Sequence, residues 1–239
     1  MPNEMTKAIQ RIKTLCCSHS ASIYAKWLSA AQTWENSAAL FRSVGQAAEK
    51  CTLFDHLAAL RYALVFRSLG FLPSFEPTGS KGPDLLILRD AAAATVEITR
   101  FRPMNPGPPV LTKEEYLQDD FLLEPYGNPQ RDIVKCLEKV RDKFPQAVGP
   151  RAIIAVWNND GALEEVEMRD ALRDLQRDPG LPEGLQMVLY GSEWACYGQQ
   201  LWCFPMKAAV DAHVQQWAYE LEAVSVTAAV ASALAMGAT

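Results

Sequence analysis

Two acidic residues lie where neighbouring strands are expected, at a spacing that could create a site for a divalent cation. Asp84 opens one apolar run, and Glu97 lies inside the next one. Side chains alternate along a strand, so Glu97 and Thr99 point to one face of the sheet and the apolar residues between them to the other. If the turn around Asp90–Ala93 holds an even number of residues, Asp84 lies opposite Glu97 or Thr99 on the same face. The two carboxylates would then converge near one end of the hairpin.

Two carboxylates at close range repel each other unless a positive charge lies between them. A hard divalent cation meets this need, and Mg²⁺ commonly takes one or two carboxylates together with waters and phosphate oxygens. The backbone carbonyl of Ile98 could add a further oxygen ligand, and Glu76, on the preceding strand, a third acidic one. Such an ion, Mg²⁺ or Mn²⁺, would polarise a phosphoryl oxygen and lower the pKa of an attacking water.

Both acidic residues also have explanations that involve no chemistry. Pro-Asp is a common junction between a turn and a strand, so Asp84 alone has a structural explanation. Strands are depleted in acidic residues, which makes Glu97 harder to explain in this way. An ion pair of Glu97 with Arg100, Arg102 or Lys81 would still do so.

The pattern along the chain predicts three parts: an N-terminal helical extension (1–50), an α/β core (51–205) and a C-terminal helical segment (206–239). Alternating strands and helices in the core predict a mixed sheet with helices packed on its faces. Gly70 is the expected stop of a long helix, and a proline-rich segment follows the second acidic strand. The expected strands are 71–77, 84–88, 95–99, 152–157 and 186–190 with a hairpin at 194–204, and the expected helices lie within 6–69 and at 128–144, 163–176 and 206 onward.

The segment Gly82-Pro83-Asp84-Leu85-Leu86-Ile87, followed by Val96-Glu97-Ile98-Thr99, resembles the PD-(D/E)XK nuclease superfamily. In that superfamily Pro-Asp opens one strand and an acidic-x-Lys sequence lies on the next. The resemblance covers roughly Cys51–Phe204. It implies a restriction-endonuclease-like fold, with a central mixed sheet flanked by helices, and Mg²⁺-dependent hydrolysis of phosphodiester bonds in DNA.

The chain departs from this motif because Thr99 stands where the lysine is expected. In family members that lysine helps to orient or activate the attacking water, and threonine carries no such charge. Some members place the lysine on the following helix, where this chain has Lys135, Lys139 and Lys143. Lys143 flanks the apolar stripe of that helix, and its stem could pack there while its head reaches the sheet edge.

Lys143-Phe144-Pro145-Gln146 also resembles the Lys-x-x-Gln of members with a migrated lysine. Lys81, three residues before Asp84, is the other candidate, and we favour Lys143 over it. The alternative for Lys143 is an ordinary solvated charge on a helix. The predicted catalytic set is therefore Asp84, Glu97, and Lys143 or Lys81.

The formal net charge of −5 counts against a nucleic-acid partner, because proteins that hold long nucleic acids usually present a basic face. Arg100, Arg102, Arg131 and Lys135 around the mouth of the site could supply one locally. A second hypothesis is therefore a catalytically inactive module on the same fold. Such a module would act in binding or assembly, as a homo-oligomer or with a partner protein, through the terminal helices.

Other features of the sequence bound its location and chemistry. No stretch combines the length and hydrophobicity of a membrane span, and Glu4, Lys7 and Arg11 interrupt the N-terminus before any apolar run. The six cysteines show no Cys-x-x-Cys spacing, and because no export signal is expected, we expect reduced thiols in a cytoplasm. The three histidines share no ligand spacing, which disfavours a zinc site. We expect a cytoplasmic protein without a membrane partner.

Overall fold

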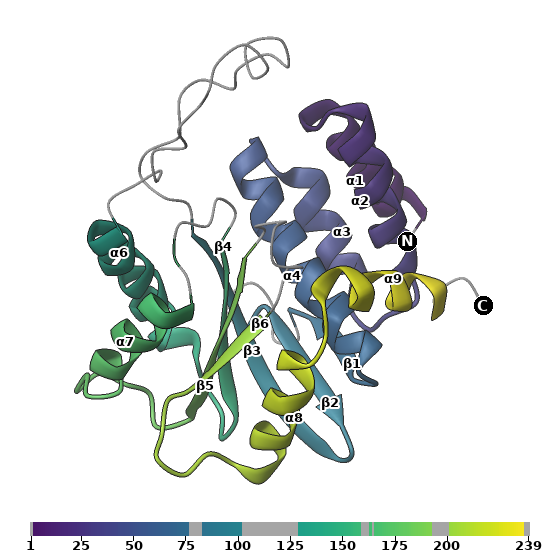
Figure 1. The fold of residues 1–239 in the computed structure, drawn as a ribbon. Coiled ribbons are helices and arrows are strands. Elements are labelled where there is room, and N and C mark those ends of the chain that lie inside the picture. Colours follow the sequence, from purple (N-terminus) through teal and green to yellow (C-terminus); the bar gives the residue numbers. More distant parts are fainter. Residues whose placement is uncertain are drawn as a thin grey trace, which may run out of the picture.

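The computed structural model describes residues 2–76, 83–101, 129–158, 163, 165–192 and 201–236. Within these ranges the chain folds as an α/β protein around a six-stranded mixed sheet with helices on both faces, as predicted (Figure 1). The strands are β1 (Leu72–Phe75), β2 (Leu85–Arg89), β3 (Ala92–Phe101), β4 (Ala152–Asn158), β5 (Leu185–Ser192) and β6 (Leu201–Pro205). The helices are α1 (Pro2–Leu15), α2 (Ser18–Ala30), α3 (Ser37–Gln46), α4 (Lys50–Ser68), α6 (Pro129–Asp142), α7 (Glu165–Leu175), α8 (Ala212–Glu222) and α9 (Val226–Met236), with a short 3₁₀ helix η1 (Phe144–Gln146).

The strands follow one another across the sheet in the order β1-β2-β3-β4-β5-β6. The pairs β1–β2, β2–β3 and β5–β6 are antiparallel, whereas β3–β4 and β4–β5 are parallel. Every residue of β4 is buried, which is typical of a parallel strand covered by helices on both faces. The acidic strand β3 lies next to β4 and is therefore near the centre of the sheet.

The turn between β2 and β3 decides where the acidic residues lie. Asp90 and Ala91 both have positive φ, 51° and 61°, as in the two-residue hairpin turns that match the twist of the sheet. This turn pairs Leu85 with Val96. The turn thus holds an even number of residues, and Asp84 comes to lie opposite Glu97, as predicted.

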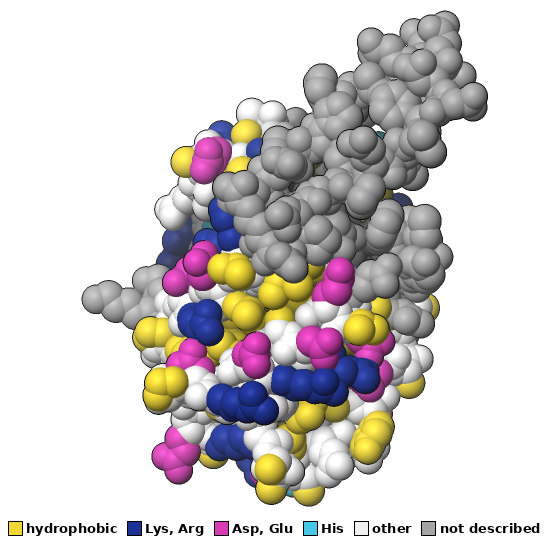
Figure 2. Space-filling view, turned by 60° about the vertical axis from the view of Figure 1, so that its left-hand side comes forward, with side chains coloured by type: hydrophobic (Ala, Val, Ile, Leu, Met, Phe, Trp, Pro, Cys, Tyr) yellow, Lys and Arg dark blue, Asp and Glu magenta, His cyan; other side chains and the backbone are white. Residues whose placement is uncertain are grey.

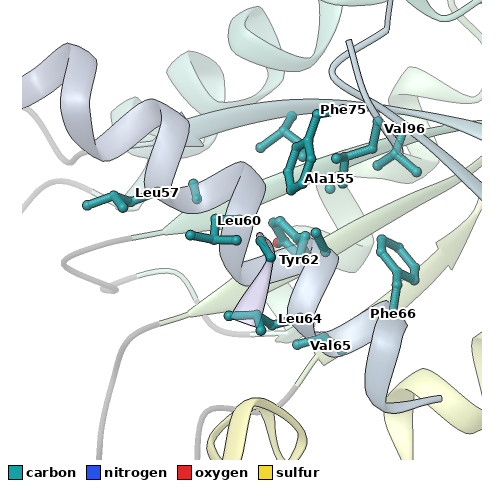
Figure 3. Packing of buried hydrophobic residues seen from close by; sticks show 14 of the residues in the cluster. Leu57, Leu60, Tyr62, Leu64, Val65, Phe66, Phe75, Val96 and Ala155 are labelled. Carbon is teal, nitrogen blue, oxygen red and sulfur yellow. The ribbon is translucent and has the colours of Figure 1, made fainter. Parts of the chain in front are cut away.

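One face of the sheet is covered by α4, which is buried on most of its sides. Figure 3 shows Tyr62 and Phe66 of α4 in the same buried cluster as Val96 and Ala155 of the sheet. The Tyr62 hydroxyl donates a hydrogen bond of 2.7 Å to the carbonyl of Val156. Buried residues of α1, α2, α3, α8 and α9 belong to the same apolar cluster, so the terminal helices share a core with the sheet.

The other face is covered by α6 and α7, which bury residues such as Ile154, Val156 and Val188. Phe101 of β3 belongs to this second cluster. Since side chains alternate along a strand, Glu97 and Thr99 point to the same face as Phe101. The candidate acidic site therefore lies on the α6 side of the sheet.

Two elements differ from the prediction. The helix expected to run to Phe144 ends at Asp142, because Pro145 has no N–H to continue the helical hydrogen bonds. The C-terminal segment, predicted as one helix, consists of α8 and α9, which meet at a bend of 101°. In the described part of the chain, none of the helices by itself has the length and apolar character needed to cross a membrane. Among the described helices, α8 and α9 meet the length and composition criteria only when they are taken together as a bent pair.

Candidate functional site

Asp84, Glu97 and Lys143 converge from three separate segments of the chain. The Lys143 ammonium donates a hydrogen bond of 3.2 Å to Glu97 Oε2 and one of 3.4 Å to Asp84 Oδ2. Asp84 comes from the start of β2, Glu97 from the middle of β3, and Lys143 follows the end of α6. The two carboxylates thus share one face of the sheet and one positive charge.

The Asp84 side chain is held by the backbone of the neighbouring strand. Its Oδ2 accepts a hydrogen bond of 2.7 Å from the N–H of Ile98. Because the N–H and C=O of one strand residue point to the same side, the Ile98 carbonyl also faces the Asp84 side. The side chain of Asp84 remains 36% exposed, so it is accessible from the solvent.

Glu97 is in a different environment, with a side chain that is only 1% exposed. Burial, and then the negative charge of Asp84, raises the pKa of Glu97 to about 7, while Lys143 opposes the shift. The second oxygen, Oε1, is buried without a hydrogen-bond partner in the described part of the chain. A buried carboxylate with an unused oxygen is costly for the fold, and a bound cation would relieve the cost.

Arg100 does not form the ion pair with Glu97 that would explain this carboxylate without chemistry. Its guanidinium donates instead to Asp55 at 2.9 Å and to the carbonyl of Cys51 at 2.8 Å, which ties β3 to the first turns of α4. Arg102 and Lys81 lie outside the described residues. Lys143 is the described residue that forms an ion pair with both Asp84 and Glu97.

A pocket of about 490 Å³ opens beside these carboxylates. It extends from Asp84 along β3 and lies between the first turns of α4 and the row of lysines on α6. It is lined by Asp55, His56, Ala59, Asp84, Ile98, Thr99, Arg100, Phe101, Lys135, Lys139 and Lys143. Thr99, at the position of the missing lysine, and Lys143 therefore face the same space.

His56 is a pocket residue that the sequence did not single out. Burial lowers its pKa, whereas the carboxylates of Asp55, Glu76 and Asp84 act to raise it, and the net result is a neutral imidazole at pH 7. The sequence allows the histidines to be assessed only as zinc ligands, because ligand spacing is the one histidine pattern that can be read along the chain. The one signal in the sequence is position, because His56 directly follows Asp55 in the helix that precedes the nuclease-like motif.

Other candidates lie elsewhere. Glu76 has a positive φ of 41°, and its carboxylate accepts a hydrogen bond of 3.1 Å from Ser43 of α3. It neither lines the pocket nor contacts Lys143, so its role as a third ligand stays a prediction. In the described ranges no three His, Cys, Asp or Glu side chains gather in a way that could hold a metal ion. Lys81 and the side chain of Arg131 lie outside these ranges.

A second and larger hollow, of about 820 Å³, lies between α1, α2 and α9. Small and apolar residues line it together with Lys13 and Lys26. It brings no acid near a base, so the smaller pocket is the better candidate for chemistry.

No protein-family model, no curated protein and no solved structure matches this chain. Function must therefore be argued from the geometry of the site.

Proposed function

We propose that this chain is a Mg²⁺- or Mn²⁺-dependent nuclease that hydrolyses phosphodiester bonds of DNA on a restriction-endonuclease-like fold. The observation that carries the proposal is the meeting of Asp84, Glu97 and Lys143 beside one pocket, which Asp84 and Lys143 line. Two carboxylates from one hairpin, and an ammonium that follows the distant helix α6, are the charges that metal-assisted phosphoryl chemistry requires. The choice of DNA rests on the resemblance of the Pro-Asp and Glu-x-Thr segments to the nuclease motif.

The donor set fits a hard divalent cation. Asp84 offers an accessible carboxylate, Glu97 a buried oxygen without a hydrogen bond, and the Ile98 carbonyl faces the same side. Mg²⁺ is commonly held by one or two carboxylates, with waters and substrate phosphates completing its shell. When bound here, the ion would polarise the phosphoryl group and lower the pKa of a water.

The protein's own groups have separate tasks in this proposal. The Ile98 N–H fixes the orientation of Asp84, and burial within the sheet fixes Glu97. The Lys143 ammonium orients the attacking water and offsets the negative charge that develops on the phosphate. The neutral imidazole of His56, in the same pocket, is able to accept a proton.

The test compares the wild type with the Asp84→Asn and Glu97→Gln variants on linear, circular and single-stranded DNA, with Mg²⁺, Mn²⁺ or EDTA. We expect cleavage by the wild type with either metal, none in EDTA, and a loss of about 100-fold or more in each variant. Asp90→Asn is a matched control, because Asp90 is 78% exposed in the β2–β3 turn and asparagine tolerates its positive φ. Thermal unfolding of all variants checks the fold. If both site variants cut as well as the wild type, the proposal is wrong.

A second candidate function is a catalytically inactive module for binding or assembly on the same fold. The bridging of both carboxylates by Lys143 favours it, because this ion pair satisfies part of the charge without a metal. Calorimetry with Mg²⁺ or Mn²⁺ separates the two functions. A nuclease shows binding heat that disappears in Asp84→Asn, whereas an inactive module shows none.

A further inference from the structure

A row of three lysines forms one wall of the pocket. Lys135 and Lys139 lie one helical turn apart on α6, and Lys143 follows at the same spacing just after the helix ends. Four residues of a helix advance it by about 6 Å and by a little more than one turn, so the three lysines follow one another along one side of α6. All three side chains line the pocket, and the row ends at Asp84 and Glu97. We call these three residues the α6 lysine row.

The row carries positive charge that the described part of the protein does not neutralise. Lys143 is paired with the two carboxylates, but neither Lys135 nor Lys139 forms an ion pair within the described ranges. The opposite wall offers Asp55, already paired with Arg100, and the neutral His56. The pocket therefore has one cationic wall that leads toward the acidic site, which suits a ligand with anions in a line.

The described arginines beside the row already have carboxylate partners. On α7 and near it, Arg169, Arg173, Arg177 and Arg141 pair with Glu165, Asp170, Asp174 and Asp178. Figure 2, in which the side that carries α6 and α7 comes forward, shows basic, acidic and apolar side chains intermixed on the described surface. A duplex presents two charged strands and calls for a broad basic surface, which the described part of this face does not offer.

The dimensions of the pocket agree with a narrow ligand. Its volume of about 490 Å³ lies within the range of pockets that hold small molecules and cofactors. We propose that the α6 lysine row binds the backbone phosphates of one nucleic-acid strand and leads that strand to Asp84 and Glu97, so that the site takes single-stranded DNA in preference to an intact duplex. This inference rests on the proposed nuclease function and narrows its substrate.

Binding measured in EDTA tests the inference without any need for catalysis. Fluorescence anisotropy with a labelled single strand, and with the duplex of the same length, gives the dissociation constants over a range of salt concentrations. For single strands, each phosphate that a protein neutralises adds about 0.7 to the slope of log K against log salt. We expect tighter binding of the single strand, and in Lys135→Gln/Lys139→Gln a slope smaller by about 1.4 together with about 10-fold weaker binding.

Lys13→Gln/Lys26→Gln is the matched control, because it removes the same charge from exposed positions on α1 and α2. Its slope should equal that of the wild type. Duplex binding as tight as single-strand binding, an unchanged slope in the row variant, an equal loss in the control, or no binding at all would each overturn the inference. Binding without metal-dependent cleavage would instead count against the nuclease function, and cleavage confined to duplexes would count against the strand preference alone.

Discussion

The Lys143 ammonium lies 3.2 Å from an oxygen of Glu97, whose side chain is 1% exposed, and thereby places a positive charge beside a buried carboxylate. A buried carboxylate without a counter-charge costs several kcal/mol, and an ion pair of good geometry repays part of that cost. The same ammonium reaches Asp84 at 3.4 Å. In the absence of a metal, Lys143 is therefore the group that allows the two carboxylates to coexist.

Replacing Lys143 by methionine keeps the apolar stem and removes the charge. We expect metal-dependent cleavage to fall by about 100-fold, because the water and the transferring phosphate lose the ammonium that orients and stabilises them. The measurement is the single-turnover rate at saturating Mg²⁺. Lys26→Met is the matched control, as Lys26 is exposed on α2 far along the chain from the site. A Lys143→Met protein that cuts at the wild-type rate would remove Lys143 from the mechanism.

The raised pKa of Glu97 predicts an unusual dependence of stability on pH in metal-free protein. Its pKa rises from 4.5 to about 7 on folding, so the folded state binds a proton that the unfolded state has already released in this interval. Glu97 therefore destabilises the fold increasingly as the pH rises from about 4.5 through 7, by on the order of 3 kcal/mol at most. Glu97→Gln, which stays neutral, lacks this contribution.

Urea unfolding in EDTA at pH 5 and pH 8 measures the effect. We expect the wild type to lose more stability than Glu97→Gln between the two pH values, and saturating Mg²⁺ to restore part of the loss at pH 8. Equal pH dependence of the two proteins would show that Glu97 has an ordinary pKa. It would also weaken the argument that a cation relieves the cost of burying this carboxylate.

The sequence predicted the central part of the site because short-range rules govern it. Alternation along a strand and the parity of one turn place Asp84 opposite Glu97, and both rules act over a few residues. The turn itself, Asp90-Ala91, lacks the glycine that usually marks such hairpins. The sequence therefore predicted the facing of Asp84 only on the condition that the turn holds an even number of residues. Lys143 was accessible to the same reasoning, since it flanks the apolar stripe that packs α6 on the sheet.

Longer-range features escaped prediction for physical reasons. The strand β1 ends at Phe75, and Glu76, which has a positive φ, accepts a hydrogen bond from Ser43 of α3. The periodicity of the sequence does not predict where α3 packs against this strand. His56 enters the pocket only through the packing of α4 against the sheet. The break between α8 and α9 falls at Val224-Ser225-Val226, where helix propensity is low, and the carbonyl of Ser225 accepts from Ala229 at a new helix start. This short-range signal is present in the sequence, and the prediction of one helix passed over it.

A double variant that removes the Lys143 charge and places a lysine at position 99 tests whether position 99 can serve as the position of the motif lysine. Thr99 lies two residues after Glu97 on the same face of β3 and lines the same pocket as Lys143. A lysine at position 99 should therefore present its ammonium to the space that the Lys143 ammonium occupies. We expect Thr99→Lys/Lys143→Met to recover about 10-fold of the rate that Lys143→Met loses, because the electrostatic contribution depends on where the charge lies.

Thr99→Met/Lys143→Met separates charge from bulk, since methionine fills similar space without an ammonium. This control should stay as slow as Lys143→Met alone, and Thr99→Lys in the wild-type background should gain little, because two like charges would then crowd the same carboxylates. If the lysine and methionine variants at position 99 recover equally, filling the pocket rather than placing the charge governs the rate. The position of the ammonium would then lose its role in the proposed chemistry.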